Sequence, residues 1–301
     1  ANINVFRVNS MVGYVSISEG VFNNTFYYSN TQTTKVVEGF VPYARENNMK
    51  LIISFRNMPS WLADNTKGWC TINSTCPPSN YTKWGELVVD YLQEVGCDAT
   101  TCAVEVWNEP NLAEYWMDNV TTRSNGNISE EYNKLYNATW IAVKKAYPTM
   151  EVGGPACTGF TSGTNNILSN WLGNFSNQTD FVSHHHYLGS FVETGNYYDG
   201  LSSDYSKIFG NITLYNGNVT KVYFDELNVW NNTIIWNYTS LYKKELALAY
   251  ISGLTLYPSN LSMGLYQWAW NTNRSIDYDS TFSMVSEPLL ENSYFSSYNV
   301  T

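Results

Sequence analysis

The chain has 301 residues, long for an average domain but ordinary for one α/β barrel, and 44% of them are hydrophobic, enough to fill a large core. No apolar run reaches about 18 residues, so the sequence predicts no membrane span. The net charge of −10 and the 16 scattered Lys and Arg residues argue against a nucleic-acid-binding protein, which needs clustered positive charge to neutralise phosphates.

Short segments rich in β-branched and aromatic residues alternate with longer amphipathic segments. The expected strands are 4–9, 50–55, 102–107, 150–153, 180–184, 221–224 and 263–268. The expected helices are 34–48, 83–96, 130–147, 165–173 and 240–256. Strand–helix alternation predicts parallel strands joined by crossover helices. The expected fold is therefore a (β/α)8 TIM-type barrel, with residues 1–301 as a single catalytic domain.

One β/α unit is missing from this pattern, because only seven strands are visible and segment 4–9 has the character of a second strand. Three explanations stay open. The precursor lost an N-terminal segment, or segment 12–18 fills the gap, or the barrel is open. The first of these would let the domain associate with the missing segment or with a partner surface protein.

The most specific motif is Val104–Asn111, in which an apolar strand runs into Asn108-Glu109 and is stopped by Pro110. This order predicts an amide and a carboxylate at the C-terminal mouth of a barrel, where such enzymes hold their active sites.

A second apolar strand ends in Asp225-Glu226-Leu227-Asn228. Two Glu residues on separate strand ends are what glycoside hydrolysis requires, one to protonate the leaving oxygen and one to attack the anomeric carbon. Asp225 competes with Glu226 for the second role. Because neighbours in a strand alternate between faces, we expect only one of the two to point into the mouth.

The cysteines pair by proximity along the chain. Cys70 with Cys76, and Cys97 with Cys102, are expected to form local disulfides that close short surface loops, as in an oxidising compartment. Neither pair has the two-residue gap usual for zinc. Cys157 is expected to be a buried free thiol.

The surface composition and the sequons both predict a secreted or cell-surface protein. Only 14% of residues are charged, while Asn, Ser, Thr and Tyr are abundant, which suits sugar ligands as well as an extracellular surface. Asn-x-Ser/Thr, the acceptor pattern for N-linked glycans, occurs fifteen times, although chance accounts for a share of these in a chain so rich in Asn and Thr. The acceptors are Asn23, Asn73, Asn80, Asn119, Asn127, Asn137, Asn174, Asn177, Asn211, Asn218, Asn231, Asn237, Asn260, Asn273 and Asn299.

The motif order resembles clan A of the glycoside hydrolases, and family 39 most of all. Besides the motif ending at Asn111, the matching segments are Met58-Pro-Ser-Trp-Leu62, Val152-Gly-Gly-Pro-Ala156, Asp180-Phe-Val-Ser-x-His185-x-Tyr187 and Glu226-x-Asn228. The resemblance runs from Val5 to about Phe295. It departs from the family in the missing first strand, in the lack of room for a β-sandwich domain, and in Asp225, which stands where Thr is common.

The resemblance implies a role for each matching residue. Glu109 would be the acid/base and Glu226 the nucleophile of a retaining mechanism, with carboxylates about 5 Å apart. Asn108 would bind the sugar 2-hydroxyl, and the charge of Arg7 would keep Glu226 ionised.

Further side chains are expected to contact the sugar. His185 and Tyr187 fit the sixth-strand pair of the clan, with Tyr187 donating to the nucleophile. Trp268 fits the aromatic floor, unless Trp270 takes that position. Trp61, Trp116 and Trp230 follow strands and would stack on sugar rings or pack in loops and core.

The run His184-His-His186 suggests a metal, but consecutive strand residues point to alternate faces and three of them cannot converge on one ion. We therefore expect no metal and no cofactor. The expected function is retaining hydrolysis of an extracellular oligo- or polysaccharide, with carbohydrate as the substrate. The alternative is a catalytically silent barrel that serves as a carbohydrate-binding or structural surface glycoprotein.

Overall fold

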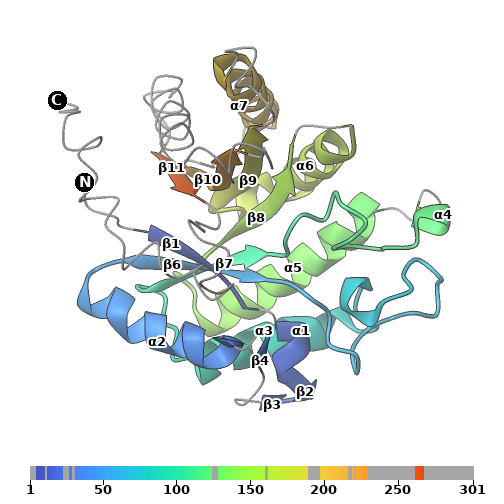
Figure 1. The fold of residues 1–301 in the computed structure, drawn as a ribbon, viewed down its shortest axis with the longest axis vertical. Helices are drawn as coiled ribbons and strands as arrows, with labels where there is room; N and C mark the ends of the chain where they lie inside the picture. Colours follow the sequence, from blue (N-terminus) through green and yellow to red (C-terminus); the bar gives the residue numbers. More distant parts are fainter. Residues whose placement is uncertain are drawn as a thin grey trace, which may run out of the picture.

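The fold is built on one curled parallel sheet, shown in a computed structural model that describes residues 5–10, 12–22, 27–28, 31–123, 128–159, 162–188, 197–215, 219, 221–229 and 262–267 (Figure 1). Within these residues the main sheet has seven strands in the order β1-β6-β7-β8-β9-β10-β11. The strands are β1 (Val5–Asn9), β6 (Lys50–Phe55), β7 (Cys102–Val106), β8 (Glu151–Thr158), β9 (Phe181–Leu188), β10 (Lys221–Val229) and β11 (Ser262–Gln267). Every neighbouring pair is parallel.

Crossover helices connect successive strands and pack beside one another along the sheet (Figure 1). The helices are α2 (Thr33–Glu46), α3 (Tyr81–Glu94), α5 (Ile128–Ala146), α6 (Ser162–Phe175) and α7 (Tyr197–Leu214), with short turns at α1 (Val12–Val15), α4 (Val120–Arg123), η1 (Asn73–Thr75) and η2 (Ser176–Gln178). Asn80 begins α3, where its side chain accepts a hydrogen bond from the backbone N–H of Lys83. None of the helices in the described ranges combines the length and the apolar character needed to cross a membrane.

The two ends of the sheet curl toward each other. β1 and β11 are the edge strands, yet they approach one another. Arg7 on β1 also bonds Glu226 on β10, which lies five strands away in the sheet order. Such a contact is possible only across the concave side of a curved sheet. The parallel, curled arrangement fits the expected TIM-type barrel, and its completion to eight strands stays a prediction, as does the single domain over 1–301.

The sequence locates the strands well and the helices less completely. All seven expected strands are present, and β8 and β10 run longer than their apolar cores suggest. Four of the expected helices are confirmed within a few residues, whereas the expected helix 240–256 lies outside the described residues. Helix α7 was not expected, because its segment is rich in Ser, Asp and Gly and carries a weak apolar stripe.

Segment 12–18 does not fill the gap in the sheet. It forms α1 and then β2 (Ser16–Ser18), which pairs antiparallel with β3 (Val21–Phe22) outside the main sheet. A second small ribbon joins β4 (Tyr27–Tyr28) to β5 (Thr31–Gln32). That explanation for the missing strand is therefore wrong, and the choice between the other two stays open.

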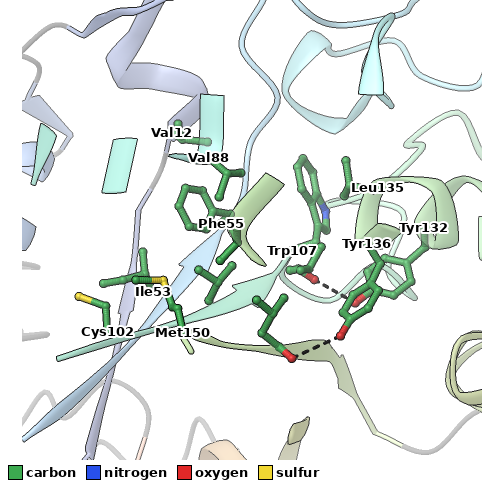
Figure 2. Close-up of a cluster of buried hydrophobic side chains, with 14 of the residues drawn as sticks. Val12, Ile53, Phe55, Val88, Cys102, Trp107, Tyr132, Leu135, Tyr136 and Met150 are labelled. Atoms are coloured by element: carbon green, nitrogen blue, oxygen red, sulfur yellow. Dashed lines mark hydrogen bonds between the residues drawn. The ribbon is translucent and has the colours of Figure 1, made fainter. Parts of the chain in front are cut away.

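The main core lies between the sheet and the helices. Phe55 on β6 lies in this core, as Figure 2 shows. Its ring packs edge-on against Trp84 and Tyr91 of α3, so that strand and helix share one aromatic cluster. The hydroxyls of Tyr132 and Tyr136 on α5 reach buried strand carbonyls, those of Val106 and Val152. These bonds satisfy polar groups that burial would otherwise leave unpaired, and they fix α5 against the sheet.

Both expected disulfides are present, and both close short loops: Cys70 pairs with Cys76, and Cys97 pairs with Cys102. The remaining cysteine, Cys157, is a buried free thiol on β8, as the sequence predicts. Burial raises the pKa of this thiol, so it stays protonated and is a poor nucleophile.

The concave side of the sheet carries two layers of side chains. The first is apolar and consists of Ile52, Ala103, Phe181 and Tyr223, with Val5 packed against it. Two residues further along four of the strands, the side chains on this same face are polar. They are Arg7, Ser54, Glu105 and Asp225. The change from apolar to polar places a charged layer toward the C-terminal ends of the strands, where barrel enzymes hold their active sites.

Candidate active site

Glu109 is presented by an unusual backbone turn at the end of β7. Trp107 and Glu109 both have positive φ values, 70° and 47°, a region that side-chain-bearing residues seldom adopt. The backbone N–H of Glu109 donates to the carbonyl of Ala156 on β8, at 3.0 Å, and fixes the turn. Strained backbone of this kind often occurs where a side chain must be aimed at a reacting group.

On β10 a bulge brings two neighbouring carboxylates to the same side. The pairing of β10 with β9 shifts register between Phe224 and Glu226, so Asp225 is an extra residue that breaks the alternation of faces. Arg7 consequently contacts both groups, with Nη1 at 2.5 Å from Glu226 and Nε at 3.3 Å from Asp225. The expectation that only one of the two would point into the mouth was therefore wrong.

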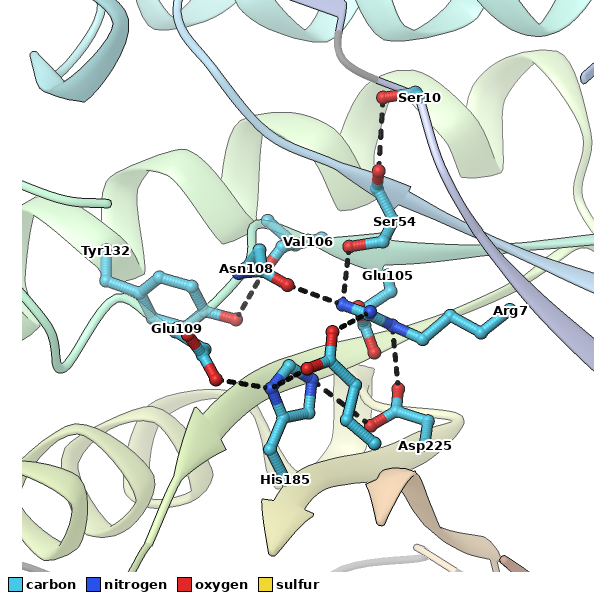
Figure 3. A network of polar contacts seen from close by, with 11 residues as sticks. Arg7, Ser10, Ser54, Glu105, Val106, Asn108, Glu109, Tyr132, His185 and Asp225 are labelled. Atoms are coloured by element: carbon cyan, nitrogen blue, oxygen red, sulfur yellow. Dashed lines mark hydrogen bonds and ion pairs between the residues drawn. The ribbon is translucent and has the colours of Figure 1, made fainter. Parts of the chain in front are cut away.

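Arg7 connects the strand ends to one another (Figure 3). Its guanidinium donates to a single oxygen of Glu105, from Nε at 2.8 Å and from Nη2 at 2.5 Å. The same Nη2 donates to Ser54 Oγ at 2.9 Å and to Asn108 Oδ1 at 2.8 Å. The side chain is only 3% exposed, so this charge acts on its partners with little screening by water.

His185 lies between the two Glu residues expected to carry the chemistry. Its Nδ1 is 2.8 Å from Glu109 Oε1 and 3.3 Å from Glu226 Oε2, and its Nε2 is 3.5 Å from Asp225 Oδ1. One oxygen each of Glu109 and Glu226 and a ring nitrogen of His185 all lie within 4.8 Å of one another. His185 thus contacts both Glu109 and Glu226, whose carboxyl groups lie close to each other.

Burial sets the protonation of two of these groups. It raises the pKa of Glu109 to about 7, and the charge of Arg7 and a hydrogen bond from Thr158 offset only part of that effect. Burial also lowers the pKa of His185 to about 3, although the charge of Glu226 acts the other way. Near neutral pH the histidine is uncharged, whereas Glu109 can both give and take a proton.

Comparison with known proteins identifies the family. The model of glycosyl hydrolases family 39 matches residues 4–234, which is most of the chain. The chain belongs to glycosyl hydrolases family 39. Relatives include a β-xylosidase from Geobacillus stearothermophilus, 34% identical over 171 residues and 54% of this chain. A β-xylosidase from Caldicellulosiruptor saccharolyticus is 30% identical over 129 residues and 40% of this chain. The chain covers 31% and 24% of the lengths of these two proteins.

Solved structures agree on the fold. The GH39 enzyme from Xanthomonas axonopodis pv. citri superposes with a TM-score of 0.58 at 18% identity, over 88% of this chain and 52% of that one. The family 44 endoglucanase from Clostridium thermocellum gives 0.57 at 15% identity, over 89% and 70%. The curled parallel sheet of this family 39 chain is therefore shared with glycosidases of several families.

The structure brings together most of the residues that the sequence selected. Glu109, Glu226, Arg7, Asn108 and His185 form one buried network. Tyr187 lies on β9 two residues beyond His185, and nothing is described of its side chain. Trp268, like Trp230 and Trp270, lies outside the described residues.

Two tryptophans differ in their positions. Trp116 is fully buried, with its ring 4.9 Å from that of Trp107 in the main core, so of the two alternatives for this residue core packing is confirmed and stacking on a sugar is wrong. Trp61 is half-buried and donates from its indole nitrogen to Ser16 Oγ at 3.1 Å. A residue on a polar loop can thus belong to the core when the loop folds back over the sheet.

Three residues of the network were missed. Glu105 and Ser54 lie within strands that the sequence marked only as apolar. A charged residue inside an apolar strand was the available signal, because a buried carboxylate needs a partner. The third is Tyr115, a half-buried residue beside Trp116, whose pKa is raised by burial and then by the charge of Glu109.

The His run divides between the two faces of β9, as strand alternation requires. His185 points to the network, whereas His184 and His186 point to Asp204 on α7, at 3.5 and 2.6 Å from one carboxylate oxygen. His184, His186 and Asp204 could hold a metal ion, as could Glu105–His185–Asp225 and Glu109–His185–Glu226. The shorter distance in the first group is that of a hydrogen bond between a ring N–H and a carboxylate, which explains it without an ion.

Proposed function

We propose that the protein is a retaining glycoside hydrolase. The observation that carries the proposal is the closeness of two carboxyl groups at the strand ends, with oxygens of Glu109 and Glu226 within 4.8 Å of each other. Retaining glycosidases separate their carboxyl groups by about 5 to 5.5 Å, whereas inverting enzymes need about 6.5 to 9.5 Å to fit a water molecule. Membership of family 39 supports the same reaction.

In this mechanism Glu226 is the nucleophile and Glu109 the acid/base. A carboxylate oxygen of Glu226 attacks the anomeric carbon while the bond from that carbon to the leaving oxygen breaks, and Glu109 gives its proton to that oxygen. Glu109 then takes a proton from water as the water attacks the same carbon and displaces Glu226. The pKa of about 7 for Glu109 suits a group that must give a proton in one step and take it back in the next.

The remaining residues of the network orient these two groups. Arg7 places a positive charge against Glu226 and holds Asn108 through its amide oxygen, which leaves the amide NH2 of Asn108 to donate to a sugar hydroxyl. Neutral His185 can donate from Nδ1 to Glu109 once that group has lost its proton.

A β-xyloside is the first substrate to test, because two relatives are named β-xylosidases. We expect an aryl β-xyloside to be hydrolysed with net retention, so that proton NMR of the first-formed sugar shows the β anomer. A panel of other aryl glycosides defines the sugar. A first product of inverted configuration would exclude this mechanism, and no hydrolysis of any member would favour the silent surface glycoprotein.

We also propose that the protein acts outside the cell and carries N-linked glycans. Seven of the fifteen sequon asparagines lie in the described part of the chain, and Asn80, Asn174 and Asn177 are exposed there. The other four, Asn73, Asn119, Asn137 and Asn211, are half-buried. Two disulfides support an oxidising compartment.

Glycopeptide mapping after production in a eukaryotic secretory host tests this proposal. We expect glycans on Asn80 and on at least one of Asn174 and Asn177, because exposed side chains leave room for a glycan on the folded protein. A secreted, active protein that lacks glycans at all three positions would contradict it.

A further inference from the structure

The cluster around Arg7 contains more carboxylates than one guanidinium can neutralise. Glu105, Asp225 and Glu226 all lie within ion-pair distance of Arg7, and their side chains are at most 5% exposed. Three ionised carboxylates and one cation would bury a net charge of about −2 in a region that water hardly reaches. Burying unpaired charge is costly enough that such groups usually take up a proton instead.

The unpaired atoms show where that proton would lie. Glu105 Oε2 and both oxygens of Asp225 have no hydrogen-bond donor among the residues that the structure describes. An oxygen of Glu105 and an oxygen of Asp225 lie within 4.8 Å of each other and of a ring nitrogen of His185, so the two carboxyl groups are neighbours in the cluster. Two ionised carboxylates offer only acceptors, so their contact is repulsive, whereas one proton between them turns it into a hydrogen bond.

We propose that Glu105 and Asp225 share one proton, which resides mainly on Asp225, and that Asp225 is a positioning residue for Arg7 and the nucleophile. The role of Glu226 as nucleophile rests on the proposed function, whereas the shared proton does not depend on it. The pair then carries a single negative charge, and the cluster of Arg7, Glu105, Asp225 and Glu226 carries a net charge of −1.

The contacts of Arg7 decide which group holds the proton. Glu105 Oε1 accepts two N–H groups of Arg7, at 2.8 and 2.5 Å, whereas Asp225 has one contact to Arg7 at 3.3 Å. The negative charge is therefore better stabilised on Glu105. In agreement, burial and then the charge of Glu105 raise the pKa of Asp225 well above its usual value. For Glu105, burial is the largest effect, but the charge of Arg7, a hydrogen bond from Asp225 and the charge of His185 together outweigh it and lower the pKa to about 2.

The shared proton determines how Arg7 and Glu226 meet. An ionised Asp225 would compete with Glu105 for the Nε–H of Arg7 and would repel Glu226, its neighbour on β10. A protonated Asp225 does neither, so Nη1 of Arg7 stays on Glu226 Oε1 at 2.5 Å. Glu226 is thereby held next to Nδ1 of His185, the same ring nitrogen that contacts Glu109.

Infrared difference spectroscopy tests the proton directly and needs no substrate. At about pH 9, above the pKa of about 7 for Glu109, we expect a carbonyl stretch of a protonated carboxylic acid in the wild-type protein. The band should shift when aspartate is labelled with ¹³C at its side-chain carboxyl and disappear in Asp225→Asn. Absence of the band in the wild type, or a band that ¹³C-aspartate leaves in place, would overturn the proposal.

Kinetic measurements on two matched carboxyl-to-amide variants distinguish a positioning role of Asp225 from a role in packing alone. Asp225→Ala should lower kcat/KM at least about tenfold, and the conservative Asp225→Asn should restore most of it, because the amide N–H replaces the shared proton. Glu105→Gln, in the same cluster, should cost at least about tenfold, because it removes the anion that Arg7 needs. Equal losses in Asp225→Asn and Glu105→Gln would mean that Asp225 is ionised. An inactive wild type with the infrared band would count against the proposed function alone.

Discussion

Replacement of Glu226 by Ala should lower turnover of every aryl glycoside by at least about 10⁴-fold, because the variant lacks the carboxylate that would form the covalent intermediate. Arg7 holds Glu226 Oε1 at 2.5 Å, and His185 lies 3.3 Å from the other oxygen, so the carboxylate is fixed at its position in the network. The loss should be the same for good and poor leaving groups, since attack on the anomeric carbon is needed with either.

Added azide gives the decisive measurement for this variant. In Glu226→Ala the small anion can enter the space left by the carboxylate and attack the anomeric carbon directly, so NMR should show a glycosyl azide of inverted configuration. Glu46→Ala, at the exposed end of α2, is the matched control and should keep wild-type activity. A retained azide product from Glu226→Ala would mean that the roles of Glu226 and Glu109 are exchanged.

The sequence was informative where one local rule acts alone. The strands follow from short runs of β-branched and aromatic residues. The pairing of Cys70 with Cys76 follows from the short chain between them. In each case the residues that determine the structure are neighbours along the chain.

The sequence failed where the outcome depends on contacts between distant segments. The bulge at Asp225 has no local signature, yet it brings Glu226 to the same face of the sheet as Asp225. Trp116 follows a strand, and the sequence could not choose between stacking on a sugar and packing in the core; the loop returns it to Trp107 in the core. Glu105 was assigned no role, because its need for Arg7 becomes clear only when β1 and β7 face each other across the curled sheet.

His185 shows the same limit in a different way. Family resemblance selected it as a sugar contact, whereas the structure places it between Glu109 and Glu226 with both ring nitrogens near carboxylates. Its position on the strand could be predicted from the alternation of β9, which sends His184 and His186 to the opposite face. Its partners could not, because they come from two other strands.

Glu109→Ala should have a smaller and leaving-group-dependent effect. With a poor leaving group, kcat/KM should fall by about 10² to 10⁴-fold, because the alkoxide must be protonated as it leaves. With dinitrophenyl glycosides the first step needs little protonation, so the covalent intermediate should accumulate and the slow step should become its hydrolysis. Azide should then raise turnover and yield a glycosyl azide of retained configuration, because azide attacks the intermediate without a general base.

The pH profile provides the second measurement for Glu109. A general acid acts while it is protonated, so with a poor leaving group the wild-type kcat/KM should fall as the pH rises through about 7, the pKa that burial gives Glu109. The same limb should be absent in Glu109→Ala, which has no proton to lose at that position. Glu114→Ala, an exposed glutamate five residues further along, is the control and should keep the limb. If the limb persisted in Glu109→Ala, another group would be the acid, and the assignment of Glu109 would be wrong.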